Sequence, residues 1–336
     1  MSTSDMQDAH LQEALVTYDK LRDIEDDMDE VEDEILRQQD KLLKDIYARR
    51  QEVIAKIPQF WPLVLEQAPP DIDEYIQPSD SALLLNSLVN LTVERFELPK
   101  GSPHSISIKW EFKENEWFEN KVLEKKFWWR RANDGWAGLV SEPVDIKWKE
   151  GKDLTGGMLG LVQKVYEEEK AGKEGETEAT KKLKQLMEDT GLGGVSFFAW
   201  FGFRGRKISI EEDKEAQKKE QERREARKAG KETEEEVDDE SDDDDDEYEM
   251  EIFPTADDLA VCIAEDLWPG AIKYFSKLDP LVNGENDAKR IDANRLSPAN
   301  AQEQDEMSDM DFESDEDQKM DDDDTKETPA AKKRKA

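Results

Sequence analysis

Cysteine and histidine are nearly absent from this chain, which has one cysteine and two histidines among its 336 residues. The single Cys262 allows no internal disulfide, and its apolar neighbours favour a small core side chain over a nucleophile. His10 falls on a predicted long helix and His104 at the start of a predicted strand, so neither is expected beside Cys262 as a partner for covalent catalysis. The glycine-rich stretches lack the lysine and hydroxyl residue of a phosphate-binding loop. We therefore expect no enzyme, no cofactor and no metal site.

Long apolar runs are also missing, and none could cross a bilayer, so we expect no membrane partner. Glycine and proline are absent before Pro58. Because these two residues are the usual helix breakers, their absence predicts one long helix over residues 5–57. From Leu21 to Leu42, with Gln38 as the one polar member, seam positions recur at alternating three- and four-residue spacing, as in a coiled coil, and the pattern continues after a one-residue slip near Asp45. The apolar residues of this seam are Leu21, Ile24, Met28, Val31, Ile35, Leu42 and Ile46.

Such a helix would form a rod of roughly 75 Å at 1.5 Å per residue, too long for one domain to cover. The simplest way to bury the seam is a second copy of the same helix, antiparallel or parallel, and we therefore predict a homodimer. A helix that packs only on its own domain is the alternative. A membrane-surface helix fits poorly, because the polar face carries Asp and Glu rather than Lys and Arg.

After Pro58 the spacing of apolar residues changes to the two-residue alternation of strands. We expect strands near residues 89–93, 105–112, 122–130 and 144–148, separated by short turns such as Asn133–Gly135. Short connections favour a four-stranded antiparallel sheet with helices on one face, in an α+β fold over residues 58–280. A helix that begins at Thr255 follows the sheet, and its outward-facing acids are Asp257, Asp258, Glu265 and Asp266.

Positive charge is nearly missing from two segments that supply most of the net charge of −37. Glu232–Glu251 holds fifteen carboxylates and no Lys or Arg, and Glu303–Asp324 holds thirteen against one lysine. Dense like charges repel and bury nothing, so we expect a largely disordered insertion over residues 204–254 and a disordered tail over 281–336. Within the insertion, residues 210–236 carry mixed charges, which are compatible with either a solvent-exposed helix or disorder. The acidic runs fit either solubility or a strongly basic partner.

The tail ends in the opposite charge. Its basic cluster resembles a nuclear-import signal and consists of Lys332, Lys333, Arg334 and Lys335. A single cysteine fits a reducing compartment, so these features favour the nucleus, with shuttling to the cytoplasm left open.

Five blocks resemble the nucleosome assembly protein family, in particular its SET/template-activating-factor branch of histone chaperones. They are IAKIPQFW, ENEWFENKVLEKKF, IKWKEGKDLT, SFFAWF and EDLWPGAIKYF, in this order between Ile54 and Phe275. The resemblance implies a dimer held by antiparallel, coiled-coil-like pairing of the long helices, each carrying an α+β "earmuff" domain. It also implies a chaperone that binds core histones as tetramer or dimer subcomplexes, shields them from nonspecific DNA contacts and promotes nucleosome assembly and disassembly without ATP.

By position, the resemblance assigns histone contacts to the four acids of the helix after Thr255 and to Ala199 and Gly202 beside SFFAWF. The last two depart from the hydroxyl residues that relatives carry there. The acidic insertion lies next to this face, which adds Asp242, Asp243, Asp244, Asp245 and Asp246 as candidates. A histone acetyltransferase or another chromatin factor is a further partner in the related branch, and sequence-specific nucleic-acid binding is not expected. Two alternatives stay open: an acidic nuclear regulator that masks another protein, such as a phosphatase inhibitor or transcription cofactor, and a coiled-coil scaffold.

Overall fold

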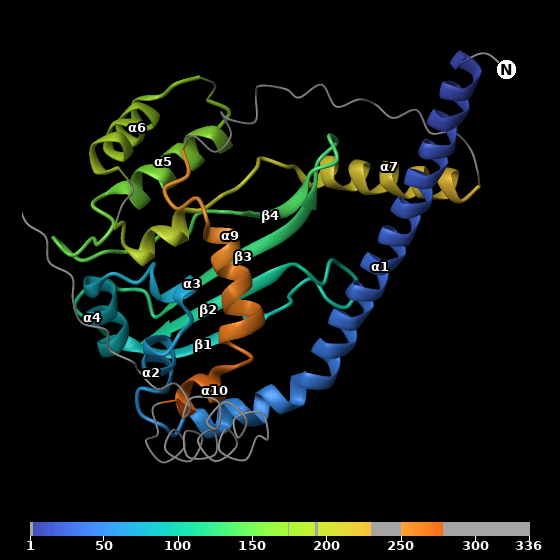
Figure 1. The fold of residues 1–336 in the computed structure, drawn as a ribbon. Helices are drawn as coiled ribbons and strands as arrows, with labels where there is room; N and C mark the ends of the chain where they lie inside the picture. Colours follow the sequence, from blue (N-terminus) through green and yellow to red (C-terminus); the bar gives the residue numbers. More distant parts are fainter. Residues whose placement is uncertain (1–2, 174, 192–193, 230–249, 278–336) are drawn as a thin grey trace, which may run out of the picture. The chain divides into compact units, whose positions relative to one another are not determined.

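The computed structural model describes residues 3–173, 175–191, 194–229 and 250–277 (Figure 1). Helix α1, Thr3–Ile54, runs for 52 residues without interruption, as the lack of glycine and proline predicts. It begins two residues before the predicted start at residue 5 and ends three residues before the predicted end at residue 57. The chain then turns at Gln59, whose φ of 57° marks a left-handed residue before the next helix.

The sheet has four strands in the order β1-β2-β3-β4, and every neighbouring pair is antiparallel. The strands are β1 (Leu88–Glu94), β2 (Ile106–Phe112), β3 (Val122–Arg131) and β4 (Ala137–Ser141). In β2 the predicted inward face is buried at Ile106, Ile108, Trp110 and Phe112. The α+β class and the antiparallel four-stranded sheet are confirmed.

The predicted position of the fourth strand is wrong. Residues 144–148 form no strand of the sheet, and Trp148 makes only a single bridge to Phe118. The strand begins instead directly after the Asn133–Gly135 turn, which Ala132 N–H closes by donating to the carbonyl of Trp136. Pro143 lacks the N–H that continued pairing needs, and Val144 donates to the carbonyl of Phe201 instead.

Short helices surround the sheet (Figure 1). They are α2 (Phe60–Glu66), α3 (Pro70–Asp73), α4 (Pro78–Ser87), α5 (Met158–Lys170), α6 (Glu178–Thr190), the 3-10 helix η1 (Phe197–Gly202), α7 (Ile210–Lys228), α9 (Ala256–Cys262), the π-helical turn η2 (Ile263–Leu267) and α10 (Ala271–Ser276). The N-cap of α4 is Gln77. Asp80 closes a capping box with it and accepts hydrogen bonds from the Ser196 hydroxyl and from the Phe197 N–H, at 2.6 and 2.7 Å.

The SFFAWF motif forms η1 and lies at the centre of the core, where the side chains of Phe198, Trp200 and Phe201 are completely buried. The Trp200 indole donates to the carbonyl of Ala256 at 2.8 Å and so fixes α9 on the core. The carbonyls at the end of η1 are satisfied by Lys125, whose ammonium donates to Phe201 and Phe203 and also to Glu142. Burial holds the pKa of Lys125 well below its usual value.

Helix α7 corrects the prediction of a largely disordered insertion for Ile210–Lys228, which form 19 helical residues. Its first turn is acidic and its last turn basic, which suits the helix dipole, and the Ser209 hydroxyl caps it by accepting from Glu212 N–H. One side of its start is buried against the end of β3, where Asp213 accepts from Arg131 N–H at 2.9 Å. Its other end contacts α1.

Candidate functional site

The predicted acids of the helix after Thr255 lie on α9 and η2, but in different surroundings. Leu259, Ile263 and Leu267 form the expected buried stripe. Asp257 is half-buried, and burial together with neighbouring Asp258 raises its pKa. Thr255 stands at the N-cap position without a capping hydrogen bond, since its hydroxyl donates to Tyr75.

The other three acids point outward, and two of them have partners. Glu265 forms an ion pair with Arg95 at 3.2 Å. Asp266 accepts a 2.6 Å hydrogen bond from the Tyr274 hydroxyl, and burial with this bond raises the pKa of Tyr274 to about 12. Asp258 is exposed and lies beside Asp257 at the start of α9. The four acids therefore differ in exposure and in their partners, and Asp258 and Glu265 are the two best placed to contact a docking protein.

A hollow, here called the α1 groove, lies between α1 and the α9–η2 segment. It consists of two adjacent cavities of about 360 and 260 Å³, both lined by Leu36, Ala264 and Glu265. Apolar side chains form much of its wall: Leu36, Leu43, Ile106, Trp129, Leu139 and Val261. The acids that line it are Glu32 and Asp40 from α1 and Glu265 from η2. An apolar wall with acids around it suits a basic segment that also carries apolar residues.

Polar contacts hold α1 beside the domain along this groove. Asp33 lies 2.9 Å from the His104 imidazole, and Arg37 donates to the carbonyl of Gly101 at 2.8 Å. Near the end of the helix, the Arg50 guanidinium donates to the carbonyl of Trp268 at 2.6 Å and stacks against the Trp268 ring, 4.3 Å from its centroid. These contacts join residues up to 218 positions apart, and they create the groove.

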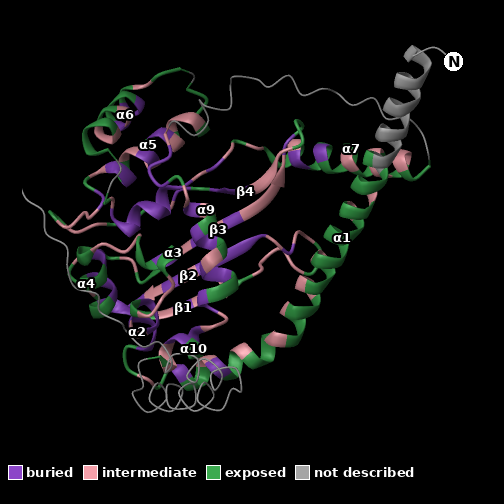
Figure 2. Cartoon of the chain, viewed as in Figure 1, coloured by how far each residue is buried: buried purple, intermediate pink, exposed green. Residues whose placement is uncertain are grey.

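The groove acids on α1, Glu32 and Asp40, were missed by the sequence analysis, although the sequence carries a signal for Asp40. Besides the apolar seam, α1 has a second seven-residue repeat at Asp26, Asp33, Asp40, Tyr47 and Ile54. These positions are less exposed than their neighbours, whereas the outward face of α1 is exposed (Figure 2). The two repeats divide the helix into one face toward its own domain and one face that the described residues leave exposed.

The predicted seam occupies that uncovered face. Its seven side chains are between 48% and 70% exposed in the single chain: Leu21, Ile24, Met28, Val31, Ile35, Leu42 and Ile46. Leu42 is the most exposed of them. A row of large apolar side chains left in water on one helix is typical of an interface.

The prediction of Ala199 and Gly202 as histone contacts is wrong, because neither residue lies at the surface. Both are buried within η1, and a Cβ on Gly202 would come within 2.9 Å of Ile252. Their small size serves the packing of the core, so neither can touch a docked protein. The predicted contacts Asp242, Asp243, Asp244, Asp245 and Asp246, and the basic cluster Lys332, Lys333, Arg334 and Lys335, lie outside the described residues.

Within the described ranges, no group of His, Cys, Asp and Glu side chains is arranged to hold a metal ion. None of the helices in these ranges combines the length and apolarity needed to cross a membrane.

Comparison with known proteins gives a match for most of the chain. Residues 3–278 match the family described as nucleosome assembly protein (NAP). A putative nucleosome assembly protein of Schizosaccharomyces pombe is 35% identical over 153 residues, which are 42% of this chain and 61% of that protein. Protein SET of Drosophila melanogaster is 37% identical over 118 residues, 34% of this chain and 41% of that protein. The chain thus aligns with about two fifths to three fifths of these relatives. Among solved structures, Ccp1 matches with 26% identity and a TM-score of 0.48, over 79% of this chain and 96% of that one.

Proposed function

Because this chain belongs to the nucleosome assembly protein family, we propose that it is a histone chaperone, which binds core histones and keeps them from nonspecific contact with DNA. The α1 groove is the observation that supports this most. Its apolar wall and its acids at Glu32, Asp40 and Glu265 match a basic protein that also offers apolar side chains.

The physical basis is competition with the DNA phosphates. Histones bind DNA mainly through Lys and Arg, which neutralise phosphates and release counterions. Carboxylates around a groove can take the place of those phosphates. Each exposed ion pair contributes at most about 1 kcal/mol and weakens with salt. Several such pairs together increase the rate of encounter and the total affinity. Shape recognition must come from the ordered wall of the groove. Transfer of the histone to DNA then needs no covalent step and no ATP.

The acidic segments of the chain extend this surface in our proposal. Glu232–Glu251 adds fifteen carboxylates between α7 and α9, with Asp242–Asp246 at its centre. The segment is attached beside the core, because its last acid, Glu251, is buried and accepts hydrogen bonds from the N–H groups of Arg204 and Gly205. Because a histone chaperone acts on chromatin, the proposal includes a nuclear location, with the basic cluster at residues 332–335 as the import signal.

Dimerisation through the α1 seam is the second part of the proposal. The seam side chains are exposed along α1, and each would be buried by a second copy of the helix. The seam and the domain-facing repeat lie on different faces, although Ile35 of the seam also lines the α1 groove. A homodimer contains two α1 grooves, one from each copy.

The binding site is tested by measuring the affinity of the purified core-histone tetramer and dimer for the full chain at physiological salt. The test variant removes the three groove acids and the exposed acid at the start of α9: Glu32→Gln, Asp40→Asn, Glu265→Gln and Asp258→Asn. A control removes four exposed charges elsewhere: Glu114→Gln, Glu119→Gln, Glu188→Gln and Asp189→Asn. At about 0.5 kcal/mol per exposed pair, the test variant should bind roughly 30-fold more weakly.

The control should stay within about twofold of the native chain. Equal losses in both variants would show a general effect of net charge and remove the groove as the site. A native chain that binds neither histone subcomplex would refute the chaperone function and favour a regulator that masks another acceptor.

A further inference from the structure

One face of α1 is unusually acidic near the start of the seam. From Asp23 to Glu34, nine of twelve residues are carboxylates and none is Lys or Arg. Asp23, Asp26, Asp27 and Glu30 recur at i, i+3, i+4 and i+7, which places them on one face of the helix. This acidic face lies next to the apolar seam at Leu21, Ile24, Met28 and Val31, and its members Asp27 and Glu30 line a hollow together with Val31.

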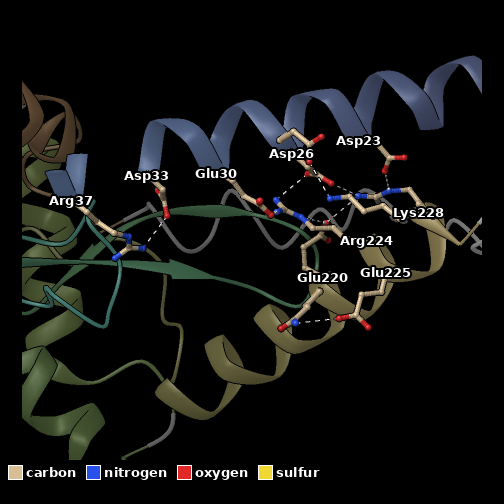
Figure 3. Close-up of polar contacts among 12 residues, drawn as sticks. Asp23, Asp26, Glu30, Asp33, Arg37, Glu220, Arg224, Glu225 and Lys228 are labelled. Carbon is tan, nitrogen blue, oxygen red and sulfur yellow. Dashed lines mark hydrogen bonds and ion pairs between the residues drawn. The ribbon is translucent and has the colours of Figure 1, made fainter. Parts of the chain in front are cut away.

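In the structure, the basic end of α7 lies on this acidic face (Figure 3). Arg227 pairs with Asp26 at 2.5 Å and with Asp23 at 3.4 Å. Arg224 pairs with Asp26 at 3.0 Å and with Glu30 at 3.3 Å, and Lys228 pairs with Asp27 at 3.0 Å. The Arg227 side chain is only 5% exposed, so it is enclosed by its acidic partners. Arginine on clustered carboxylates is also how an arginine-rich protein would bind here.

The attachment of α7 is strong at its start and purely polar at its end. Its buried residues, Asp213 and Ala216, both lie in the first two turns, where α7 meets β3. Beyond Ala216 the helix continues as QKKEQERREARK, whose only apolar residue is Ala226. The end of α7 is therefore held on α1 mainly by ion pairs. Salt weakens the exposed pair of Lys228 with Asp27 most and the enclosed pairs of Arg227 less, and another cation can replace α7 at each of these carboxylates.

We propose that the end of α7 is an internal competitor for the acidic face of α1, and that an arginine-rich segment of a bound histone displaces it. Arg224, Arg227 and Lys228 hold the face until a partner with more positive charge arrives. A tethered competitor acts at a high effective concentration, so it rejects weak or sparsely charged cations. The acidic face then becomes a second contact surface, additional to the α1 groove. This inference rests on the proposed histone binding.

The test compares the full chain with two variants of equal net charge. In the release variant, the three contacts are removed by Arg224→Gln, Arg227→Gln and Lys228→Gln. In the control, three exposed lysines of the same helix are changed: Lys214→Gln, Lys218→Gln and Lys219→Gln. The release variant should bind the core-histone tetramer about fivefold more tightly than the control, because the competitor is gone. Its affinity should also fall more steeply with salt, because more carboxylates take part.

A second set adds Asp23→Asn, Asp26→Asn and Asp27→Asn to the release variant, and the gain in affinity should then disappear. Circular dichroism checks that each variant keeps its helix content. Equal affinity of release and control variants, or weaker binding by the release variant, overturns the proposal. These results differ from failure of the proposed function, in which the native chain and every variant bind no histone.

Discussion

The exposed seam of α1 allows a quantitative prediction about dimerisation. Met28 and Leu42 are the two most exposed seam side chains, at 63% and 70%, and neither lines the α1 groove. Complete burial of such a side chain contributes about 1.5–3 kcal/mol, so covering the part exposed here contributes about 1 kcal/mol beyond alanine. The variant Met28→Ala/Leu42→Ala loses this at four positions of a dimer, or about 4 kcal/mol. The dimer dissociation constant should rise roughly a thousandfold.

Sedimentation equilibrium over a range of protein concentrations measures this constant directly. The matched control is Leu85→Ala/Ile272→Ala, which truncates two apolar side chains that are 47% and 57% exposed but lie outside α1. Neither pair of changes should lower the helix content, because alanine favours helices. The reasoning fails if the native chain is a monomer at micromolar concentration, or if the seam and control variants dissociate alike.

Three further predictions concern groups that the fold buries. Asp257→Asn should stabilise the fold at neutral pH relative to the native chain. Burial raises the pKa of Asp257 in the folded state. The native chain therefore loses stability as the pH rises above the unfolded-state pKa of about 4, and the uncharged asparagine avoids this loss. Denaturant unfolding at several pH values checks this, and the advantage should vanish below pH 4. Lys125→Met should lower the free energy of unfolding by about 3 kcal/mol in urea titrations, because three carbonyls lose their donor. Arg50→Lys should lower the free energy of unfolding by about 2 kcal/mol in the same assay, because lysine cannot both stack on the Trp268 ring and reach the Trp268 carbonyl. An unchanged urea midpoint in Lys125→Met or in Arg50→Lys would contradict the role given to that side chain.

Local sequence patterns predict most of the fold because the forces behind them are local. The absence of glycine and proline determines α1, and two-residue alternation gives β1, β2 and β3 close to their observed limits. The fourth strand was misplaced because residues 144–148 alternate like a strand while Pro143 prevents pairing. The helix α7 could not be separated from disorder by charge alone, since its order depends on Asp213 at β3 and on the acids of α1.

The candidate site was only partly predictable. The acids of α9 and η2 follow from the helical pattern, but their differences do not, because Arg95 and Tyr274 reach Glu265 and Asp266 from other elements. The α1 groove depends on contacts between distant residues, such as Arg50 with Trp268. Asp40, one of its two acids on α1, belongs to a seven-residue repeat that is visible in the sequence, whereas Glu32 lies outside that repeat. The sequence does not show that the repeat faces the domain, because this depends on contacts between distant residues such as Asp33 and His104.

Release of DNA from histones tests the central claim most directly. A short fluorescent duplex is bound to the core-histone tetramer at physiological salt, and the full chain is added without ATP while anisotropy reports the bound DNA. The account predicts that the native chain frees the duplex, and that the variant lacking the charges of Glu32, Asp40, Asp258 and Glu265 reaches half-release at a roughly 30-fold higher concentration of free protein. Duplex that stays bound at concentrations of the native chain far above the histone concentration would contradict it.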